Sequence, residues 1–221
     1  MSDSDLKASF EKNWRIAQWF PDLSDLQQTM LRVYYLELLK FNPKINLISR
    51  RTEPEADQVH FADSIMAGKL ILFRNKADTI VDIGSGNGFP GLVMAILSPD
   101  RKLVLLDKDQ RKVEFLKHVA ARVGLKNVTC FNGLLDAYPE ASIECGVSRG
   151  FASLSGAVIA ARKAFKIGGE YYHMKGSVWA TEMAEIPTQV CSLWAPGLAA
   201  DYRLPETSIN LSLVVTKKIA K

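Results

Sequence analysis

The feature that most constrains this chain is a glycine-rich segment, IVDIGSGNGFPGLVMAI, which covers residues 80–96. It follows a short apolar run typical of a buried strand and opens a run with helical spacing. Its glycines, Gly84, Gly86 and Gly88, allow a tight turn and let the backbone approach a ligand closely. A strand, a glycine loop and a helix in this order predict the ligand-binding turn of an open α/β sheet.

The rest of the chain after Thr79 repeats this alternation of short apolar strands and helical segments. Strands are expected at TIVDI, KLVLLD, NVTCF, ECGVS, GEYYHMK, QVCSLWA and SLVVTKK, and helices at GLVMAIL, QRKVEFLKHVAARV, SGAVIAARKAF and VWATEMAEI. Such alternation predicts a parallel sheet with helices on both faces. The last two strands, around PGLAADYRLPETS, are expected to form an antiparallel, hairpin-like edge.

The N-terminal part of the chain is predicted to be helical instead. Apolar residues at helical spacing predict helices over LKASFEKNWRIAQWF and LSDLQQTMLRVYYLELLKF, and a third helix is predicted from Glu55 to Leu72. Ser24 is expected to cap the second helix, and Asn42-Pro43 to end it. The sequence thus predicts a helical cap, residues 1–77, on a doubly wound α/β domain, residues 78–221, in one compact unit.

Composition excludes several classes of protein. Of the 221 residues, 48% are hydrophobic and 24% are charged, as in a folded globular protein. No apolar run approaches the roughly 18 residues of a membrane span, and the polar N-terminus lacks the apolar core of a secretory leader. The three cysteines and three histidines have no metal-ligand spacing. We therefore expect a cytoplasmic protein with reduced thiols and no bound metal.

The charge pattern permits a nucleic-acid partner without requiring one. The net charge is +4, and eight basic residues stand against three acidic ones between Arg101 and Lys126. Arg50, Arg51 and this basic helix are candidate phosphate contacts, although a solvated helix face accounts for most of the helix.

The glycine loop differs from a dinucleotide-binding loop. A dinucleotide site requires Gly or Ala five residues after Gly84, where this chain has Phe89, and a phenyl ring would obstruct the close approach of helix and strand. Asp82 precedes the loop, and a carboxylate suits a ligand with an ammonium group better than one with a diphosphate. S-adenosylmethionine has that ammonium group and no phosphate. Asp107 ends the next strand, where it is expected either to bind ribose hydroxyls, as in both ligand classes, or to cap the next helix.

Ligands of an open α/β sheet bind beyond the carboxyl ends of its strands. This rule places Leu134 and Leu135 at the adenine edge of the ligand and Arg149 near the transferable methyl group. A solvated loop charge is the alternative interpretation of Arg149.

These segments resemble the RsmG (GidB) family, bacterial methyltransferases that act on a guanine of 16S ribosomal RNA. The matching pieces are KINLIS, VHFADSI, VDIGSGNGFPG, LLDKDQRKVEFL, VSRGFASL and YYHMKG, of which GSGNGFPG and SRGFASL are the most specific. The resemblance implies a class I methyltransferase fold with a Rossmann-like sheet, S-adenosylmethionine as donor, and transfer to nitrogen-7 of a guanine in the decoding-region loop. It implies 16S rRNA or the small ribosomal subunit as partner, and we expect a monomer.

The predicted donor site combines the loop, the strand ends and the positions that the resemblance carries over. It comprises Asp82, Gly84, Gly86, Gly88, Phe89, Asp107, Leu134, Leu135 and Arg149. The chain departs from the family where Leu135 replaces an acidic residue, whose role Asp136 or a backbone carbonyl would take. It also has Val59 where Arg commonly precedes the His, and it lacks the basic residue that often precedes the last strand.

The chemistry implied by the resemblance needs no general base, because guanine nitrogen-7 carries no proton. Catalysis is then a matter of positioning the reactants. We expect Arg149 or Lys175 to bind the guanine oxygen beside nitrogen-7, and Phe151 to stack on the base. Replacing Arg149 with Ala is expected to lower methyl transfer far more than stability.

The substrate side of the cleft is predicted from the KINLIS and VHFADS segments. The candidates are Asn46, Arg50, His60, Asp63 and Ser64. The alternative is that His60 and Asp63 form a hydrogen-bonded pair or cap that fixes the third helix to the sheet. The alternative functions are a methyltransferase acting on another RNA, a protein or a small molecule, and a non-catalytic donor-binding module on the ribosome. Phe89 disfavours an NAD-dependent oxidoreductase.

Overall fold

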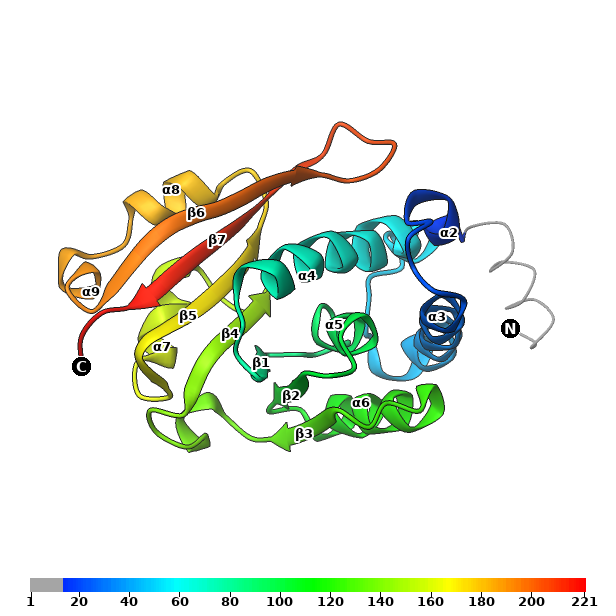
Figure 1. Ribbon diagram of the computed structural model, residues 1–221, viewed down its shortest axis with the longest axis horizontal. Coiled ribbons are helices and arrows are strands. Elements are labelled where there is room, and N and C mark those ends of the chain that lie inside the picture. Colours follow the sequence, from blue (N-terminus) through cyan, green and yellow to red (C-terminus); the bar gives the residue numbers. More distant parts are fainter. Residues whose placement is uncertain (1–13) are drawn as a thin grey trace.

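A mixed sheet of seven strands runs through the centre of the protein, as seen in the computed structural model, which describes residues 14–221 (Figure 1). The strand order is β3-β2-β1-β4-β5-β7-β6. The strands are β1 (Thr79–Ile83), β2 (Lys102–Asp107), β3 (Val128–Asn132), β4 (Ile143–Arg149), β5 (Phe165–Lys175), β6 (Trp194–Arg203) and β7 (Asn210–Lys218). β1 to β5 are parallel, whereas β7 runs antiparallel to both β5 and β6. The predicted parallel sheet with an antiparallel edge is confirmed.

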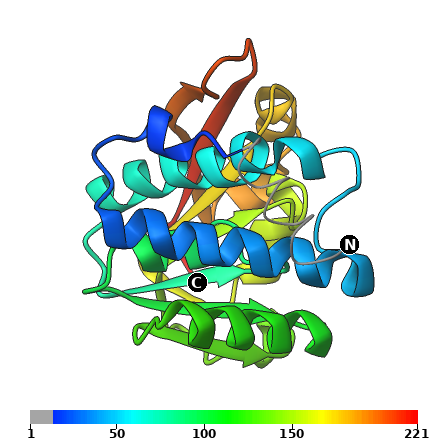
Figure 2. The ribbon, with the colours of Figure 1, turned by 90° about the vertical axis from the view of Figure 1, so that its right-hand side faces the viewer.

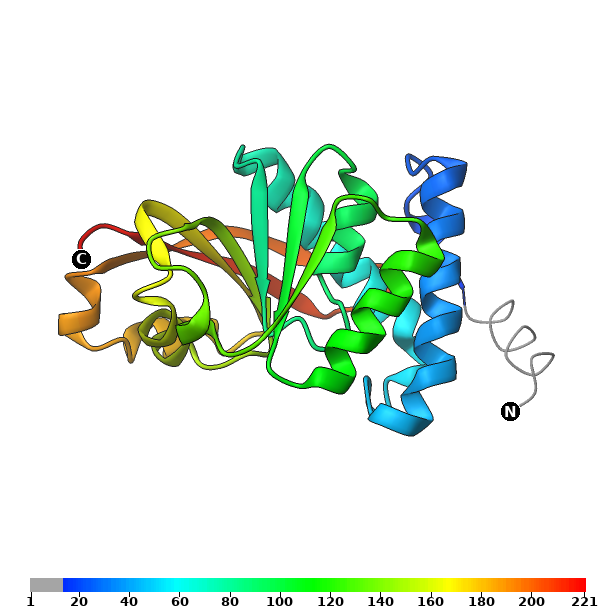
Figure 3. The ribbon, with the colours of Figure 1, turned by 90° about the horizontal axis from the view of Figure 1, so that it is seen from below.

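Helices cover both faces of the sheet (Figures 1 and 3). They are α2 (Ile16–Trp19), α3 (Asp25–Ile45), α4 (Asp63–Arg74), α5 (Gly91–Leu97), α6 (Gln110–Val123), α7 (Leu154–Ala161), α8 (Trp179–Ala184) and α9 (Thr188–Cys191). Two 3-10 helices, η1 (Glu53–Glu55) and η3 (Leu135–Ala137), and one π-helix, η2 (Asp57–Ala62), complete the described helical segments. α3 to α6 pack on one side of the sheet and α7 to α9 on the other. Among the described residues, no helix combines the length and the apolar character that crossing a membrane requires.

The central strands are buried on both faces, as expected for parallel strands between helical layers. In β1, Ile80 packs into the core under α3 to α6, whereas its neighbour Val81 packs into the core under α7. Leu105 and Leu106 of β2 divide between the same two cores. Successive side chains of a strand point to opposite faces, so each apolar run fills two layers at once.

The N-terminal helices share their core with the sheet. Leu31, Tyr34 and Leu38 of α3 belong to the same buried cluster as Leu92 of α5 and Leu103 of β2. Figure 2 shows α3 lying across this side of the molecule, with α6 alongside it. At their crossing, the carboxylate of Glu37 accepts hydrogen bonds from His118 at 2.7 Å and Arg122 at 3.3 Å.

The second predicted helix begins as expected and ends later. Ser24 caps α3 through a capping box with Gln27, which confirms its predicted role. The helix runs to Ile45 and includes Pro43, so the predicted end at Asn42-Pro43 is wrong. Proline in the last turn removes a single helical hydrogen bond, and the Asn42 side chain stabilises the exit by accepting from the amides of residues 47 and 48 at 2.8 and 2.9 Å.

Other boundaries differ in informative ways. The predicted first helix lies mostly outside the described residues, and α2 is its described part. The third predicted helix consists of η1, η2 and α4 in succession. The predicted strand QVCSLWA is wrong at its start, because Pro187 opens the turn α9 and the Val190 amide donates to its carbonyl at 2.8 Å. β6 begins only at Trp194 and uses residues expected to form a connection.

Candidate active site

The glycine loop joins β1 to α5 in a conformation that only glycine adopts easily. Gly84, Gly86 and Gly88 have φ of 72°, 54° and 97°. The amides of Gly84 and Ser85 donate to the Leu106 carbonyl at 2.8 and 2.9 Å, which holds the loop at the end of β2. A Cβ on Gly88 would lie 2.5 Å from Leu92 Cδ1. The positive φ angles therefore favour glycine at all three positions, and at Gly88 a side chain would also lack room.

Asp82 supports this loop from below. Its side chain is fully buried, and its Oδ2 accepts from the Gly91 amide at 3.0 Å. The Ser85 hydroxyl donates to the Asp82 carbonyl at 2.8 Å. Within residues 14–221, Oδ1 has no hydrogen-bond partner. Burial raises the pKa of Asp82 to about 7, against the hydrogen bond from the Gly91 amide, which lowers it.

Contacts with the N-terminal helical cap fix the other end of the glycine loop. Phe89 is buried between aromatic rings, with centroids 5.0 Å from Tyr34 and 4.8 Å from Phe61. The Tyr34 hydroxyl donates to the Asn87 carbonyl at 2.6 Å, and the Asn87 side chain donates to the Leu47 carbonyl at 3.0 Å. Phe89 thus anchors the loop to the helical cap and does not line the adjoining pocket.

The loop pocket, about 380 Å³, lies beyond the carboxyl ends of β1 to β4. Its lining residues are Gly84, Leu106, Asp107, Lys108, Lys112, Gly133, Leu134, Leu135, Asp136, Gly150, Phe151 and Ala160. The Asp107 carboxylate receives the Gly86 amide on one oxygen and the Asp109 amide on the other, both at 2.8 Å. Phe151 lies against the loop, since a Cβ on Gly84 would meet its ring at 2.7 Å.

The two leucines after β3 have different surroundings. Leu134 is 60% exposed and offers an apolar surface at the pocket, whereas Leu135 is buried and belongs to the core under α7. Asp136 also lines the pocket. The structure therefore provides a carboxylate at the pocket directly after Leu135 in the chain.

Arg149, the last residue of β4, is the centre of a polar network. Its Nη1 donates to Asp63 Oδ2 at 3.1 Å and to the Val59 carbonyl at 3.3 Å. Its Nη2 donates to His60 Nδ1. The Tyr202 hydroxyl donates to the other Asp63 oxygen at 2.7 Å. Arg149 also lies over the Phe89 ring, 5.6 Å from its centroid, so it is a partly buried network residue rather than a solvated loop charge.

The network fixes the protonation of His60. Nδ1 accepts from Arg149, so Nε2 carries the proton and donates to the Thr52 hydroxyl at 3.1 Å. Burial, together with the Arg149 charge, lowers the pKa of His60 to about 3. His60 is therefore neutral and has both nitrogens occupied at physiological pH.

A hairpin pocket of about 280 Å³ lies on the other side of Arg149. It is lined by Val59, Asp63, Arg149, Met174, Lys175, Gly176, Tyr202, Leu204, Ile209 and Leu211. The Lys175 ammonium donates to Glu182 Oε2 at 2.7 Å and to the Ala152 carbonyl at 2.8 Å. Lys175 thus ties the end of β5 to α8 and to the segment after Arg149.

Some predicted residues lie elsewhere. Asn46 and Arg50 line a separate pocket beside the end of α3, and neither lines the two pockets around Arg149. Ser64 is fully buried in α4, so the structure does not bring its hydroxyl to the site. The alternative interpretation of His60 and Asp63 is correct in part: both hold η2 and α4 to the sheet, but through Arg149 rather than through each other.

Sequence reasoning missed Tyr202 and Thr52. Tyr202 is 139 residues from Asp63, and no local pattern connects the two positions. Lys108 and Lys112 belong to the basic segment that was predicted to offer phosphate contacts, and the structure places both in the lining of the loop pocket. In the described part of the chain, no cluster of three or more His, Cys, Asp or Glu side chains offers a metal site.

Solved structures share this fold. A SAM dependent methyltransferase from Aquifex aeolicus superimposes with a TM-score of 0.56 at 11% identity, covering 81% of this chain and 98% of that one. Precorrin-6y C5,15-methyltransferase from Geobacter metallireducens gives a TM-score of 0.54 at 15% identity, covering 78% and 91%. At such identities the likeness shows the fold alone, and it confirms the predicted class I methyltransferase fold.

Sequence comparisons give the family. The model of the family GidB, rRNA small subunit methyltransferase G, matches residues 27–195. Ribosomal RNA small subunit methyltransferase G 3 of Bdellovibrio bacteriovorus is 47% identical over 221 residues, which is 100% of both chains. Ribosomal RNA small subunit methyltransferase G of Neisseria gonorrhoeae is 34% identical over 194 residues, covering 86% of this chain and 92% of that protein. The chain therefore belongs to the rRNA small subunit methyltransferase G family.

Proposed function

We propose that this chain transfers the methyl group of S-adenosylmethionine to nitrogen-7 of a guanine in 16S ribosomal RNA, in the decoding-region loop of the small subunit. Membership of the family supports small-subunit rRNA as the substrate and S-adenosylmethionine as the donor. The monomeric state and the cytoplasmic location remain predictions from the sequence.

The loop pocket has the residues that this donor requires. S-adenosylmethionine supplies an activated methyl group on a positively charged sulfur. The Asp107 carboxylate at the end of β2 would accept the ribose hydroxyls, and the exposed face of Leu134 would contact the adenine. Asp136 is the acid available to the adenine amino group. Asp82, which holds the loop through the Gly91 amide, is proposed to act by fixing the backbone that faces the donor.

One observation carries the choice of guanine nitrogen-7: the titratable groups around Arg149 are already engaged. Both oxygens of Asp63 are bonded, by Arg149 and Tyr202, and both nitrogens of His60 are bonded, by Arg149 and Thr52. No general base is thus available in this network. An acceptor atom that carries no proton needs none, and guanine nitrogen-7 is such an atom.

The network also suits the charge that the reaction creates. Methyl transfer to nitrogen-7 leaves the guanine ring positive, and an isolated Arg beside it would repel that charge. Here Asp63 balances Arg149 at 3.1 Å. The remaining guanidinium N–H groups can then bind the guanine oxygen at lower electrostatic cost, which is stabilisation by a preorganised site.

The test is to incubate the protein with labelled S-adenosylmethionine and three acceptors in parallel: unmethylated small subunits, naked 16S RNA and total protein. We expect label in small subunits or 16S RNA, and mapping of the modified base is expected to give 7-methylguanine at one site. Label in protein alone would refute the proposed function. Label at another position of a base or on a ribose would refute the choice of nitrogen-7.

A further inference from the structure

The hairpin pocket is bounded in part by the β6–β7 hairpin, whose apolar side chains have no role in the proposed function. Tyr202 lies in β6 and Leu204 directly after it, whereas Ile209 directly precedes β7 and Leu211 lies at the start of that strand. Met174 of β5 lines the same pocket. Ile209 is 45% exposed, so this apolar wall is open to a ligand.

The hairpin pocket and the loop pocket are neighbours at one edge of the sheet. Arg149 lines the hairpin pocket, and the next residue, Gly150, lines the loop pocket. Arg149 ends β4 and Gly150 is the first residue after it. A donor in the loop pocket with its methyl group near Arg149 would therefore present that group toward the hairpin pocket.

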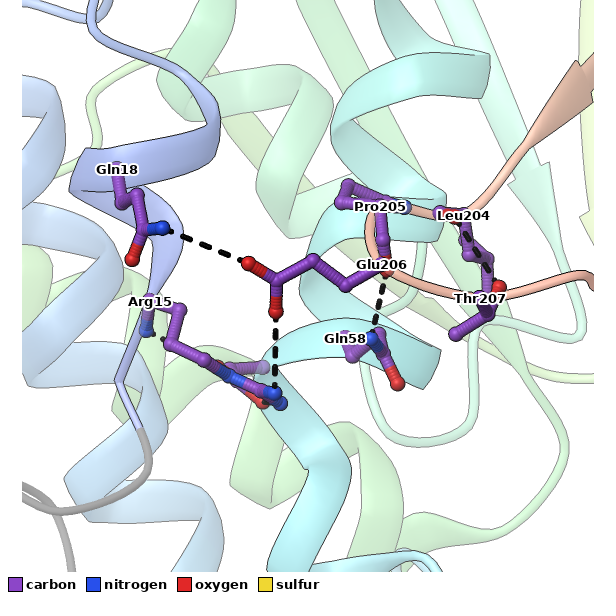
Figure 4. Close-up of polar contacts among 8 residues, drawn as sticks. Arg15, Gln18, Gln58, Leu204, Pro205, Glu206 and Thr207 are labelled. Carbon is purple, nitrogen blue, oxygen red and sulfur yellow. Dashed lines mark hydrogen bonds and ion pairs between the residues drawn. The ribbon is translucent and has the colours of Figure 1, made fainter.

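The wall is held in place by contacts between the tip of the hairpin and the N-terminal elements (Figure 4). Gln58 of η2 donates to the Pro205 carbonyl at 2.7 Å. Glu206 accepts from the Gln18 side chain at 3.4 Å and lies 3.7 Å from Arg15 Nη1. With the bond from Tyr202 to Asp63, these contacts tie β6 and the turn of the hairpin to the cap. The pocket is thus a formed site in the folded chain.

We propose that the hairpin pocket takes the target guanine after that base has left its stack, with Ile209 and Leu211 as its apolar wall. This inference rests on the proposed function. Apolar side chains suit the faces of an unstacked base, and the cations Arg149 and Lys175 at one side suit the oxygen beside nitrogen-7. A volume of about 280 Å³ is small for a drug-sized ligand and fits a single base.

In this position the reaction balances without any further group. A bond forms between guanine nitrogen-7 and the methyl carbon, and the bond from that carbon to sulfur breaks. The sulfur keeps the electron pair and becomes neutral, while the guanine ring takes the positive charge. No proton moves. The role of the wall is to exclude water and to hold the base in line with the methyl group.

The test fills the pocket. Ile209→Trp places an indole in the space for the base, and we expect kcat for methylation of unmethylated small subunits to fall about 100-fold. The affinity for S-adenosylhomocysteine, measured by calorimetry, and the urea midpoint are expected to stay at wild-type values. Ile219→Trp is the matched control, because Ile219 is 48% exposed and lines neither pocket. That control is expected to methylate like the wild type.

A second variant keeps the experiment informative if Ile209→Trp fails to fold. Ile209→Ala removes the wall without adding volume, and it is expected to raise the KM for small subunits several-fold with unchanged S-adenosylhomocysteine affinity. If both variants match the wild-type protein, the pocket proposal is overturned while the proposed function stands. If the wild-type protein does not methylate 16S RNA, the proposed function fails and this inference fails with it.

Discussion

At the scale of single residues, Arg149 has a structural role in addition to its predicted role in methyl transfer. It bonds Asp63, His60 and a backbone carbonyl in a partly buried setting. Its removal would leave the Asp63 carboxylate buried with one hydrogen-bond donor. The expectation from sequence, that Arg149→Ala lowers activity far more than stability, therefore needs revision.

Arg149→Ala is expected to lower methyl transfer about 100-fold and also to reduce the free energy of unfolding by about 3 kcal/mol, because breaking a buried ion pair leaves an uncompensated charge. Urea unfolding and a methyl-transfer assay measure the two effects. The double variant Arg149→Ala with Asp63→Asn is expected to regain stability without regaining activity. Wild-type activity in the single variant would remove Arg149 from the mechanism.

Asp82 gives a pH prediction. Its pKa is about 7 in the folded chain and 3.8 for the ordinary side chain, so the folded state keeps this proton longer as the pH rises. The contribution of Asp82 to the free energy of unfolding is therefore fully present below pH 3.8, falls above that pH, and is lost as the pH rises through about 7. Between pH 5 and 6, the wild-type protein is expected to lose about 1.4 kcal/mol relative to Asp82→Asn. Urea unfolding from pH 5 to 8 measures this, with Asp100→Asn as the exposed control.

The prediction concerns the difference between the two proteins, which removes the contributions that all other groups make to both. If the free energy of unfolding changes with pH in parallel for the wild type and Asp82→Asn, then Asp82 does not retain its proton. In that case the raised pKa plays no part in stability.

At the scale of elements, β6 reaches the network through one side chain. Tyr202→Phe removes the hydroxyl that donates to Asp63 at 2.7 Å and is expected to cost about 1–3 kcal/mol of unfolding free energy. The kcat is expected to fall as well, because Asp63 positions Arg149. Tyr138→Phe is the control, since its hydroxyl has no hydrogen bond among the described residues. Unchanged kcat and stability in Tyr202→Phe would show that the hairpin does not act through Asp63.

Elements whose periodicity is local were predictable from the sequence. β1, β2, α5 and α6 have the predicted boundaries, since alternation or helical spacing over one segment determines each of them. The end of α3 was not predictable, because the Asn42 side chain stabilises a helix that contains proline. β6 was not predictable as a strand either, since it exists through its pairing with β7.

The residues of the candidate site likewise include some that were predictable from the sequence and some that were not. Gly84, Asp107 and Leu134 were predictable, because strand ends in an open α/β sheet meet at one edge. Tyr202 was not, because its contact with Asp63 depends on a hairpin that folds back over the sheet. Asn46 and Ser64 failed to reach the site because a helix end and a buried helix face direct them elsewhere.

At the scale of the whole molecule, much of the local positive charge is neutralised. Of the basic residues from Arg101 to Lys126, Arg101 donates to backbone carbonyls, and Arg111, Lys117 and Arg122 pair with acids. Within the described chain, four lysines of this segment have no such partner: Lys102, Lys108, Lys112 and Lys126. Of these, Lys108 and Lys112 line the loop pocket and are the candidate phosphate contacts beside the site.

Lys112→Gln is expected to weaken the binding of small subunits and to reduce the slope of log affinity against log salt by about one, as for the loss of one phosphate contact. The measurement is a salt titration of binding without the donor. Lys126→Gln, three residues after the end of α6, is the control and is expected to keep the wild-type slope. Equal slopes for all three proteins would place the phosphate contacts elsewhere.

The place of β7 in the sheet has a consequence for folding during synthesis. β7 lies between β5 and β6, although translation produces it after both. A nascent chain that ends before residue 210 contains the glycine loop and the five parallel strands but lacks β7. It cannot attach β6 to the sheet or bring Tyr202 to Asp63. An enzyme proposed to modify ribosomes thus becomes competent only after its own seventh strand has emerged from one.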